Sequence, residues 1–456
     1  MAQFISDRWL TPHRNGGSAA PEYSNNMKVR KYMYLKLLKH KSFMAFWGTT
    51  TFFRLASNIL QFALAIYVLD MTGSAFIYST VLAIIIIPRI ILSSVAGYIA
   101  DRKECLQILK WSVLGLFVLM ACFWIIHVFL MPLNILLIYV LVVCLELFET
   151  LIAPSEGKAL MCIVCENELA AASKISSLDD GIVEILSPAV GSLFYGLLGL
   201  TSVLMITMTL EGISFLLTFM IHVKSGYISY EEENKEKNVF SLTQTISAYK
   251  EAALYLKNEN SIVYLLFFAP IFNFFVNPLF SVTTSHYIRI SMAASMEKYA
   301  MFNSALGIAS LVAPFIAMVL IQDEDEKKAN MISSLFCAVI LFMLTCFLHF
   351  KSSQISPSNL LYSVTIIMMI LVVEVTTMSI ATSITLKKRI PEYIMGRILS
   401  IIQLCATISV PIGQLFYGIC ADCFPITFSF LISSCGLVFS FIIMKKFYKK
   451  SIKNKK

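Results

Sequence analysis

The sequence predicts an all-α membrane protein with twelve transmembrane helices in two six-helix repeats. Of its 456 residues, 58% are hydrophobic and 14% are charged, whereas soluble proteins carry about 25% charged residues. The apolar residues form continuous runs of about 20 residues, the length that a helix needs to cross a bilayer. A membrane β-barrel would instead alternate apolar and polar residues. A hexapeptide that recurs in the two halves of the chain indicates the repeat.

Twelve apolar runs are long enough to be spans. They cover residues 43–69, 75–98, 107–129, 133–153, 171–198, 202–222, 261–288, 298–321, 329–349, 359–386, 395–420 and 425–445. Of the 36 Lys and Arg residues, 31 lie before the first run, in the connections after the even-numbered runs, at the end of the chain, or in the run ends that adjoin these segments. Because cytoplasmic connections are rich in Lys and Arg, both termini are predicted to be cytoplasmic.

The spans divide the chain into five parts. We expect a cytoplasmic N-terminal tail at 1–42, a six-helix bundle at 43–222, a cytoplasmic linker with an amphipathic segment at 223–260, a second six-helix bundle at 261–445 and a basic cytoplasmic tail at 446–456. The N-terminal tail lacks the apolar core of a signal peptide and is expected to be disordered.

The recurring hexapeptide lies in the fifth and the eleventh spans. Residues 191–196 read GSLFYG, residues 413–418 read GQLFYG, and a proline shortly precedes each copy. Equivalent positions in two halves indicate a duplicated unit, which is typical of transporters. Small residues let helices approach closely, so Pro188, Gly191, Pro411 and Gly413 are predicted to lie at tight helix contacts.

Several other classes of function are excluded by the sequence. The net charge of +8 comes from basic residues that flank apolar runs, not from one basic domain, so a nucleic-acid-binding protein is not expected. The pairs Cys162/Cys165 and Cys420/Cys423 have no companion ligands for a zinc site. No phosphate-binding loop of the Gly-x-x-x-x-Gly-Lys-Ser/Thr type occurs. We therefore predict no enzyme, no metal site and no cofactor.

A charged stretch, Gly97–Lys103, joins the second and third spans. We expect it to form a short hairpin. A glycine allows two helix ends to approach closely, and Asp101, beside Arg102, can pair with a helix N-terminus or a cation. Between two membrane-length helices, this pattern predicts the inner gate of an alternating-access transporter.

Polar residues inside the spans are functional candidates because an ionisable group in a bilayer is costly. Arg54, Asn58 and Gln61 share one face of the first span. Other spans carry Glu146 and Glu149, Asp180 and Glu184, Asn273 and Asn277, and Glu374. A half-buried carboxylate has a raised proton affinity and can load and release a proton. The proton-coupling candidates are therefore Asp180, Glu184, Glu146 and Glu374.

Four ionisable groups receive more specific interpretations. Arg54 is expected to pair with Asp180 or Glu184, either as part of the coupling mechanism or as a structural salt bridge. Arg89 is expected to extend towards the inner face. Glu149 is placed near the cytoplasmic end of the fourth span, as a gate partner of Arg102 or a substrate contact. Glu211 is interpreted as a helix–helix hydrogen-bond partner.

These motifs resemble the major facilitator superfamily, and within it the bacterial drug:proton antiporter branch that includes macrolide efflux proteins. The resemblance covers residues 43–445 and rests on Thr72–Ala75, Pro88, Gly97–Arg102, Glu168–Ala172, Ile390–Tyr393 and Gly396–Ile398. The chain departs from the branch's pattern in two places. Glu104–Leu106 replace the glycine and basic residues that continue the gate motif, and Ser187–Ser192 replaces a Gly-Pro-x-x-Gly-Gly motif.

The resemblance implies that spans 1, 4, 7 and 10 line a central cavity between two rocking bundles. The substrate-cavity candidates are then Arg54, Asn58, Gln61, Asn273 and Asn277. The gate candidates are Gly97, Asp101, Arg102, Glu149, Gly396 and Arg397, with Asp101 closing the gate against the start of the eleventh span.

The function predicted is proton-coupled efflux of an amphipathic small molecule, such as a macrolide-type drug, by a monomer in the bacterial cytoplasmic membrane. Its partners are the substrate, protons and the lipid bilayer. One alternative keeps the fold and exports or imports a siderophore, peptide or metabolite. Another is a membrane sensor or partner protein that has lost transport.

Overall fold

The computed structural model describes residues 34–102, 104–222, 260–321, 326–351, 354–390 and 392–453. Every regular element in these ranges is a helix, and eleven of these helices are long and apolar enough to cross a membrane. The predicted class of helical membrane protein is confirmed. Most of the expected N-terminal tail and the linker with its amphipathic segment lie outside the described ranges.

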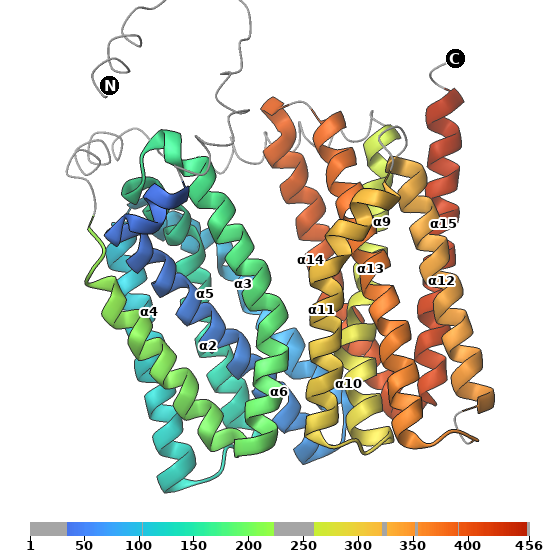
Figure 1. The fold of residues 1–456 in the computed structure, drawn as a ribbon, viewed down its shortest axis with the longest axis horizontal. Helices are drawn as coiled ribbons and strands as arrows, with labels where there is room; N and C mark the ends of the chain where they lie inside the picture. The colour runs from blue at the N-terminus through green and yellow to red at the C-terminus, as the bar shows by residue number, and fades with distance from the viewer. Residues whose placement is uncertain are drawn as a thin grey trace, which may run out of the picture.

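The helices form two bundles (Figure 1). The N-terminal bundle contains α2 (Lys41–Thr72), α3 (Ala75–Arg102), α4 (Cys105–Ile125), α5 (Ile135–Ile163) and α6 (Glu166–Thr218). The C-terminal bundle begins with α9 (Asn260–Pro278), which continues through α10 (Thr284–His286) and two π-helical turns to Ser291. It ends with α11 (Met296–Leu320), α12 (Glu326–Lys351), α13 (Pro357–Arg389), α14 (Glu392–Cys423) and α15 (Ile426–Lys453).

Local sequence determines where several helices begin and end. The side chains of Asn134, Ser295 and Ser356 each accept a hydrogen bond from the backbone N–H three residues later, at the starts of α5, α11 and α13. Such caps satisfy N–H groups that have no partner within the helix. Gly73 ends α2 with a φ of 66°, a left-handed conformation that glycine adopts without steric penalty. The chain therefore turns directly from α2 into α3.

The longest helix, α6, is folded back on itself. It contains 53 residues, about 80 Å of helix at 1.5 Å per residue, which far exceeds the roughly 30 Å hydrocarbon layer. Gly199 interrupts it with non-helical dihedral angles, φ 71° and ψ 178°. Figure 1 shows α6 running to the lower edge of the bundle and then back. The break lies between the predicted spans 171–198 and 202–222.

Two predicted details of the helices are wrong. The stretch Gly97–Arg102 is helical and ends α3, so the expected hairpin is reduced to the link before Cys105. The helix α5 continues to Ile163, ten residues beyond the predicted end of the fourth span. Both errors have one cause: an apolar run marks the part of a helix that lies in hydrocarbon, whereas the helix itself continues into polar residues.

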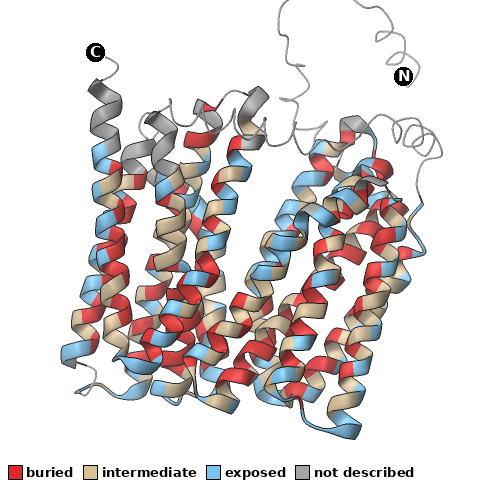
Figure 2. Ribbon diagram, turned by 180° about the vertical axis from the view of Figure 1, so that it is seen from behind, coloured by how far each residue is buried: buried red, intermediate tan, exposed pale blue. Residues whose placement is uncertain are grey.

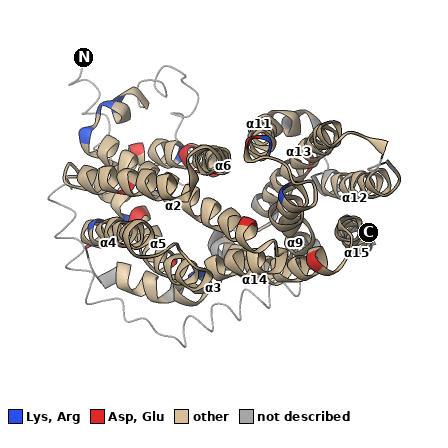
Figure 3. Cartoon of the chain, turned by 90° about the horizontal axis from the view of Figure 1, so that it is seen from below, with Lys and Arg blue, Asp and Glu red and all other residues tan. Residues whose placement is uncertain are grey.

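The outer faces of the helices are apolar. Large hydrophobic side chains such as Trp111, Phe129, Phe315 and Val319 are exposed, and Figure 2 shows exposed positions along the outward-facing sides of the helices. Figure 3 shows how few charged residues lie along the described helices. A soluble protein rarely exposes such an extended apolar surface, so these faces are suited to contact lipid.

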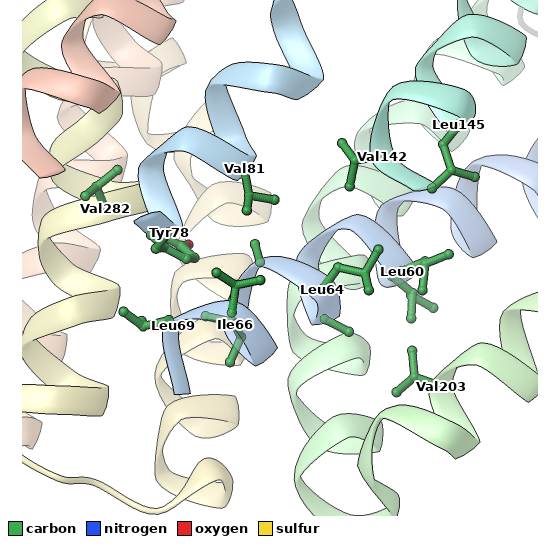
Figure 4. Close-up of a cluster of buried hydrophobic side chains, with 14 of the residues drawn as sticks. Leu60, Leu64, Ile66, Leu69, Tyr78, Val81, Val142, Leu145, Val203 and Val282 are labelled. Carbon is green, nitrogen blue, oxygen red and sulfur yellow. The ribbon is translucent and has the colours of Figure 1, made fainter. Parts of the chain in front are cut away.

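The two bundles meet through two helix pairs, α3 with α14 and α6 with α11. They lie closest at the edge where α2 ends and lean apart towards the opposite edge (Figures 1 and 2). A buried apolar cluster joins them, and Figure 4 shows Ile66, Leu69 and Tyr78 of the N-terminal bundle beside Val282 of the C-terminal bundle. This edge of the interface is therefore packed like a protein core.

Candidate functional site

A cavity of about 680 Å³ lies between the two bundles. Ligand-binding pockets typically have volumes of about 300–1,000 Å³, so a drug-sized molecule fits. The described wall comes from α2, α3, α6, α9 with its continuation, α11 and α13. The expectation that the fourth span lines this cavity is wrong, since α5 contributes none of the described lining residues. Its polar side chains point instead into the N-terminal bundle.

The cavity wall is apolar and amide-rich with a single carboxylate. Phe62, Phe272 and Phe280 supply aromatic surface, while asparagine and serine residues supply neutral hydrogen-bonding groups. Glu184, on α6, is the one Asp, Glu, Lys, Arg or His among the described lining residues. An apolar wall with few polar groups suits an amphipathic molecule, and a lone carboxylate favours a positive charge on it.

The predicted cavity residues divide into two groups. Asn273 and Asn277 line the cavity, whereas Arg54, Asn58 and Gln61 are not among its described lining residues. The wall supplied by α11 was not predicted from the sequence. A usable signal was present, because Asn303, Gly307 and Ser310 recur at helical spacing on one face of that helix.

Arg54 connects three helices of the N-terminal bundle. It forms ion pairs with Glu156 of α5 and with Asp180 of α6, the second being one of the two partners suggested by the sequence. Beside them, Thr51 donates a hydrogen bond to Asp179 over 2.7 Å. Asp180 lies one turn from the cavity residue Glu184, so this ion-pair cluster adjoins the cavity without lining it.

A second cluster lies deeper in the same bundle. The guanidinium of Arg89 donates to both carboxylate oxygens of Glu146, over 3.1 and 2.9 Å, and lies 3.5 Å from Glu149. Gln61 donates to Glu149 over 2.8 Å and to Glu146 over 3.3 Å. The expectation that Arg89 extends to the inner face is therefore wrong. Glu149 lies near the middle of α5, not at its end, because that helix is longer than predicted.

The remaining proton-coupling candidate, Glu374, is half-buried and lies on the side of α13 that meets α12. It lies close to Ser333 and Cys337 of α12, while the described cavity residues of its own helix are Val372 and Val375. Its position offers no contact with a molecule in the cavity described above.

The helix-packing glycines make equivalent contacts in the two bundles. A Cβ atom on Gly191 would lie 3.3 Å from a backbone oxygen of α2, and one on Gly413 would lie 2.6 Å from a backbone oxygen of α9. Each glycine thus packs its helix, which also carries Pro188 or Pro411, against the first helix of its own bundle. Gly191 and Gly413 are the first residues of the two copies of the repeated hexapeptide, so the repeat makes an equivalent helix contact in each bundle.

The predicted gate residues other than Glu149 lie in α3 and α14. Gly97, Asp101 and Arg102 belong to the C-terminal end of α3, and Gly396 and Arg397 to the first turns of α14. The side chains of the four residues other than Gly97 lie outside the described part of the structure. These two helices pack against each other. Because the contacts of those four side chains are not described, the gate role stays a prediction.

A cross-bundle ion pair joins the other edge of the interface, where the sequence predicted no contact. Arg289 lies in the middle of the π-helical turn after α10. Its guanidinium binds both carboxylate oxygens of Asp70, with Nη2 2.8 Å from each. Tyr195 of α6 donates to the same carboxylate over 3.2 Å. Arg289 also donates to the backbone oxygen of Ala294, so its side chain is fixed on both sides.

A second cross-bundle contact lies beside this ion pair. Asp422, in the last turn of α14, accepts hydrogen bonds from Ser74 Oγ over 2.6 Å, Ala75 N over 2.6 Å and Phe76 N over 3.0 Å. His286 Nε2 lies 3.9 Å from the same carboxylate. A carboxylate at a helix N-terminus satisfies free N–H groups and interacts favourably with the helix dipole. Asp422 therefore holds the start of α3 against the end of α14.

The sequence contained a signal for Asp422 that was overlooked. Residues 97–101 read GYIAD and residues 418–422 read GICAD, so α3 and α14 end with the same pattern. Asp422 reaches the first turn of α3, and therefore the two helices are antiparallel. Asp101 is the matching residue of the sequence pattern at the far end of α3.

The fold and this interface define a membrane protein of the major facilitator type. The family profile described as Transmembrane secretion effector matches residues 34–456. The chain belongs to that family of major facilitator proteins, which is a family of transporters and not of enzymes. None of the curated proteins compared with the chain matches it.

Solved transporter structures share the fold at low sequence identity. A D-xylose–proton symporter superposes with a TM-score of 0.68 at 14% identity, over 91% of this chain and 98% of that chain. A bacterial homologue of the iron transporter ferroportin in an inward-facing state gives 0.63 at 13%, over 92% and 99%. A POT family transporter in complex with a thioalcohol-conjugated peptide gives 0.65 at 11%, over 91% and 99%. These similarities establish the fold alone.

Proposed function

We propose that this protein is a secondary active transporter that exports an amphipathic small molecule, such as a macrolide-type drug, in exchange for protons. The observation that carries the proposal is a 680 Å³ cavity between two bundles that are joined at one edge by Asp70–Arg289 and Asp422. A site between two bodies that contact each other at one end fits alternating access, in which the bundles rock around the bound molecule.

The proposed topology has twelve spans with both termini in the cytoplasm. The fold-back at Gly199 supports counting α6 as two spans, and the eleven membrane-length helices of the described residues would then give twelve spans. The start of α2 and the end of α15 lie at the same edge in Figure 1, as an even number of spans requires. The excess of Lys and Arg beside these ends assigns that edge to the cytoplasm. The joined edge is then extracellular, and the conformation is inward-facing.

The cavity wall favours a cationic amphipath as the exported molecule. Its aromatic and aliphatic side chains suit an apolar body, the asparagines suit neutral polar groups, and Glu184 suits a protonated amine. Glu184 therefore contacts substrate in this proposal. Proton coupling is assigned to the carboxylates of the N-terminal bundle, where Arg54 and Arg89 hold acidic partners inside the membrane.

Transport into inverted membrane vesicles tests this function. Vesicles that carry the protein are energised and offered macrolides, cationic dyes and siderophores, with and without an uncoupler. We expect accumulation of a cationic amphipath that collapses with the uncoupler and is reduced by E184Q. Uncoupler-insensitive flux would contradict proton coupling. Accumulation of siderophores alone, or of nothing in the panel, would favour a metabolite transporter or a protein that has lost transport.

A further inference from the structure

A buried carboxyl group with no neutralising partner among the described residues lies inside the N-terminal bundle. Glu211, on the second arm of α6, is fully buried. Neither of its carboxyl oxygens has a hydrogen-bond partner among the described residues. The sequence interpretation of Glu211 as a helix–helix hydrogen-bond partner is therefore wrong. One turn away, Ser214 and Thr49 donate to each other's backbone oxygens over 2.9 and 3.4 Å, which fixes this arm of α6 against α2.

The charged groups that face Glu211 belong to the Arg89 cluster. Glu149 of α5 lies within electrostatic range of Glu211, and Arg54 of α2 and Arg89 of α3 act in turn on Glu149. On the α4 side, the residue beside Glu211 is Gly212, whose neighbour is the ring of Phe117. The charged group that acts on Glu211 among the described residues is thus another carboxylate, which repels a negative charge on Glu211.

The charges in this part of the bundle do not balance if every acid is ionised. Among the described residues, Arg89 is the one cation that contacts Glu146 and Glu149, while Arg54 is bound to Glu156 and Asp180. Glu211 has neither a cation nor a hydrogen-bond donor among the described residues. Burying an unpaired charge is far more costly than taking up a proton. The described residues contain no group of three His, Cys, Asp or Glu side chains arranged to hold a metal ion, so a proton is the fitting ligand.

We propose that Glu211 and Glu149 form a proton-binding site inside the N-terminal bundle, separate from the substrate cavity, and that the coupling proton binds there. The inference rests on the proposed proton-coupled transport. In the present conformation Arg89 neutralises Glu146 and contacts Glu149, so the proton resides on Glu211. The side chain of Arg89 is 51% exposed, and in this proposal it withdraws from the two carboxylates when the bundles move. Its withdrawal removes the one cation that contacts Glu149 among the described residues, leaves only the more distant influence of Arg54, and makes Glu149 the second proton acceptor.

This arrangement separates the two ligands in space. The substrate contacts Glu184 in the cavity, whereas the proton binds among α2, α3, α5 and α6 on the far side of Gln61, which donates to Glu149. The position of Arg89, a residue of the interface helix α3, then links the proton site to the movement of the bundles. Neither ligand has to displace the other directly from one carboxylate.

Infrared difference spectroscopy of the purified full-length protein in lipid tests the site without any substrate. The C=O stretch of a protonated carboxyl group reports the proton directly. We expect this signal at neutral pH in the unmodified protein, its loss in E211Q, and its retention in E297Q, a surface control at the start of α11. Because both Glu211 oxygens are unpartnered, E211Q removes no described hydrogen bond. An unchanged signal in E211Q would overturn the proposal.

The second arm of the test concerns Glu149. In R89Q we expect an additional protonated-carboxyl signal, which is lost in the double variant R89Q/E149Q. Absence of the added signal in R89Q would contradict the role of Glu149.

The vesicle assay then tests coupling. If the unmodified protein accumulates a compound and E211Q accumulates it equally well, the proton site is refuted while the transport function stands. If the unmodified protein accumulates none, the proposed function fails, and the infrared result alone decides whether Glu211 carries a proton.

Discussion

Asp422 is expected to set the balance between the conformation described here and one in which the joined edge is open. The variant D422N keeps the size of the side chain but removes its charge and one of the two acceptor oxygens that bind Ser74, Ala75 and Phe76. Loss of a helix cap costs about 0.5–2 kcal/mol, and loss of a charge at a helix N-terminus costs about 0.3–1 kcal/mol. A shift of about 1–2 kcal/mol changes the ratio of the two conformations roughly 5- to 30-fold.

Electron–electron distance measurements between two spin labels test this shift. Met71 after Asp70 and Phe424 after α14 are exposed and belong to different bundles, so labels there report the separation of the edge in a background without the native cysteines. We expect the long-distance population to grow in D422N but not in E297Q, a nearby carboxylate with no described cross-bundle bond. Identical distance distributions in D422N and the parent protein would refute the role of Asp422.

Three further predictions concern the ion pair, the cavity and the packing. D70R or R289D alone should open the joined edge and the double exchange should close it again, as read by the same label distance; failure of the exchange to restore it would argue against the pair. E184Q should raise the Kd for cationic compounds roughly tenfold or more, because a charge-assisted hydrogen bond contributes about 1.5–3 kcal/mol, while binding of uncharged compounds stays constant. G413A should lower the Tm, since overpacking costs about 1–3 kcal/mol and its Cβ would lie 2.6 Å from a backbone oxygen. G157A, in the interior of α5, should not lower the Tm, because its Cβ would meet nothing within 4 Å and alanine favours a helix more than glycine does.

The class of fold could be predicted from the sequence because hydropathy is a property of single segments. The orientation of each helix about its own axis could not be predicted, because it depends on which neighbouring helix each face contacts. Gln61 and Asn277 both belong to polar stripes with helical spacing, yet Gln61 turns into its own bundle to bind Glu149 while Asn277 faces the cavity. Periodicity identifies a polar face, and only tertiary packing decides whether that face meets a partner helix or open space.

The joined edge could not be predicted for a different reason. Asp70 and Arg289 lie at span ends, where charged residues are common and normally face water. They are 219 positions apart in the chain, and nothing local links them. The pair Arg54–Asp180, 126 positions apart in sequence, was suggested only because both residues lie inside spans, where a charge requires a partner. Glu211 met the same criterion, but its lack of a partner becomes visible only in three dimensions.

Proton movement during transport is the most direct test of a proton-coupled exporter. Purified protein is reconstituted into liposomes that enclose a pH-sensitive dye, and a cationic amphipath identified in the vesicle panel is added to one side with no pH gradient present. The account predicts that protons cross the membrane in the direction opposite to the substrate. The internal pH therefore changes in response to the substrate gradient, and this change disappears in E211Q. Substrate flux with no accompanying change of pH would contradict the account.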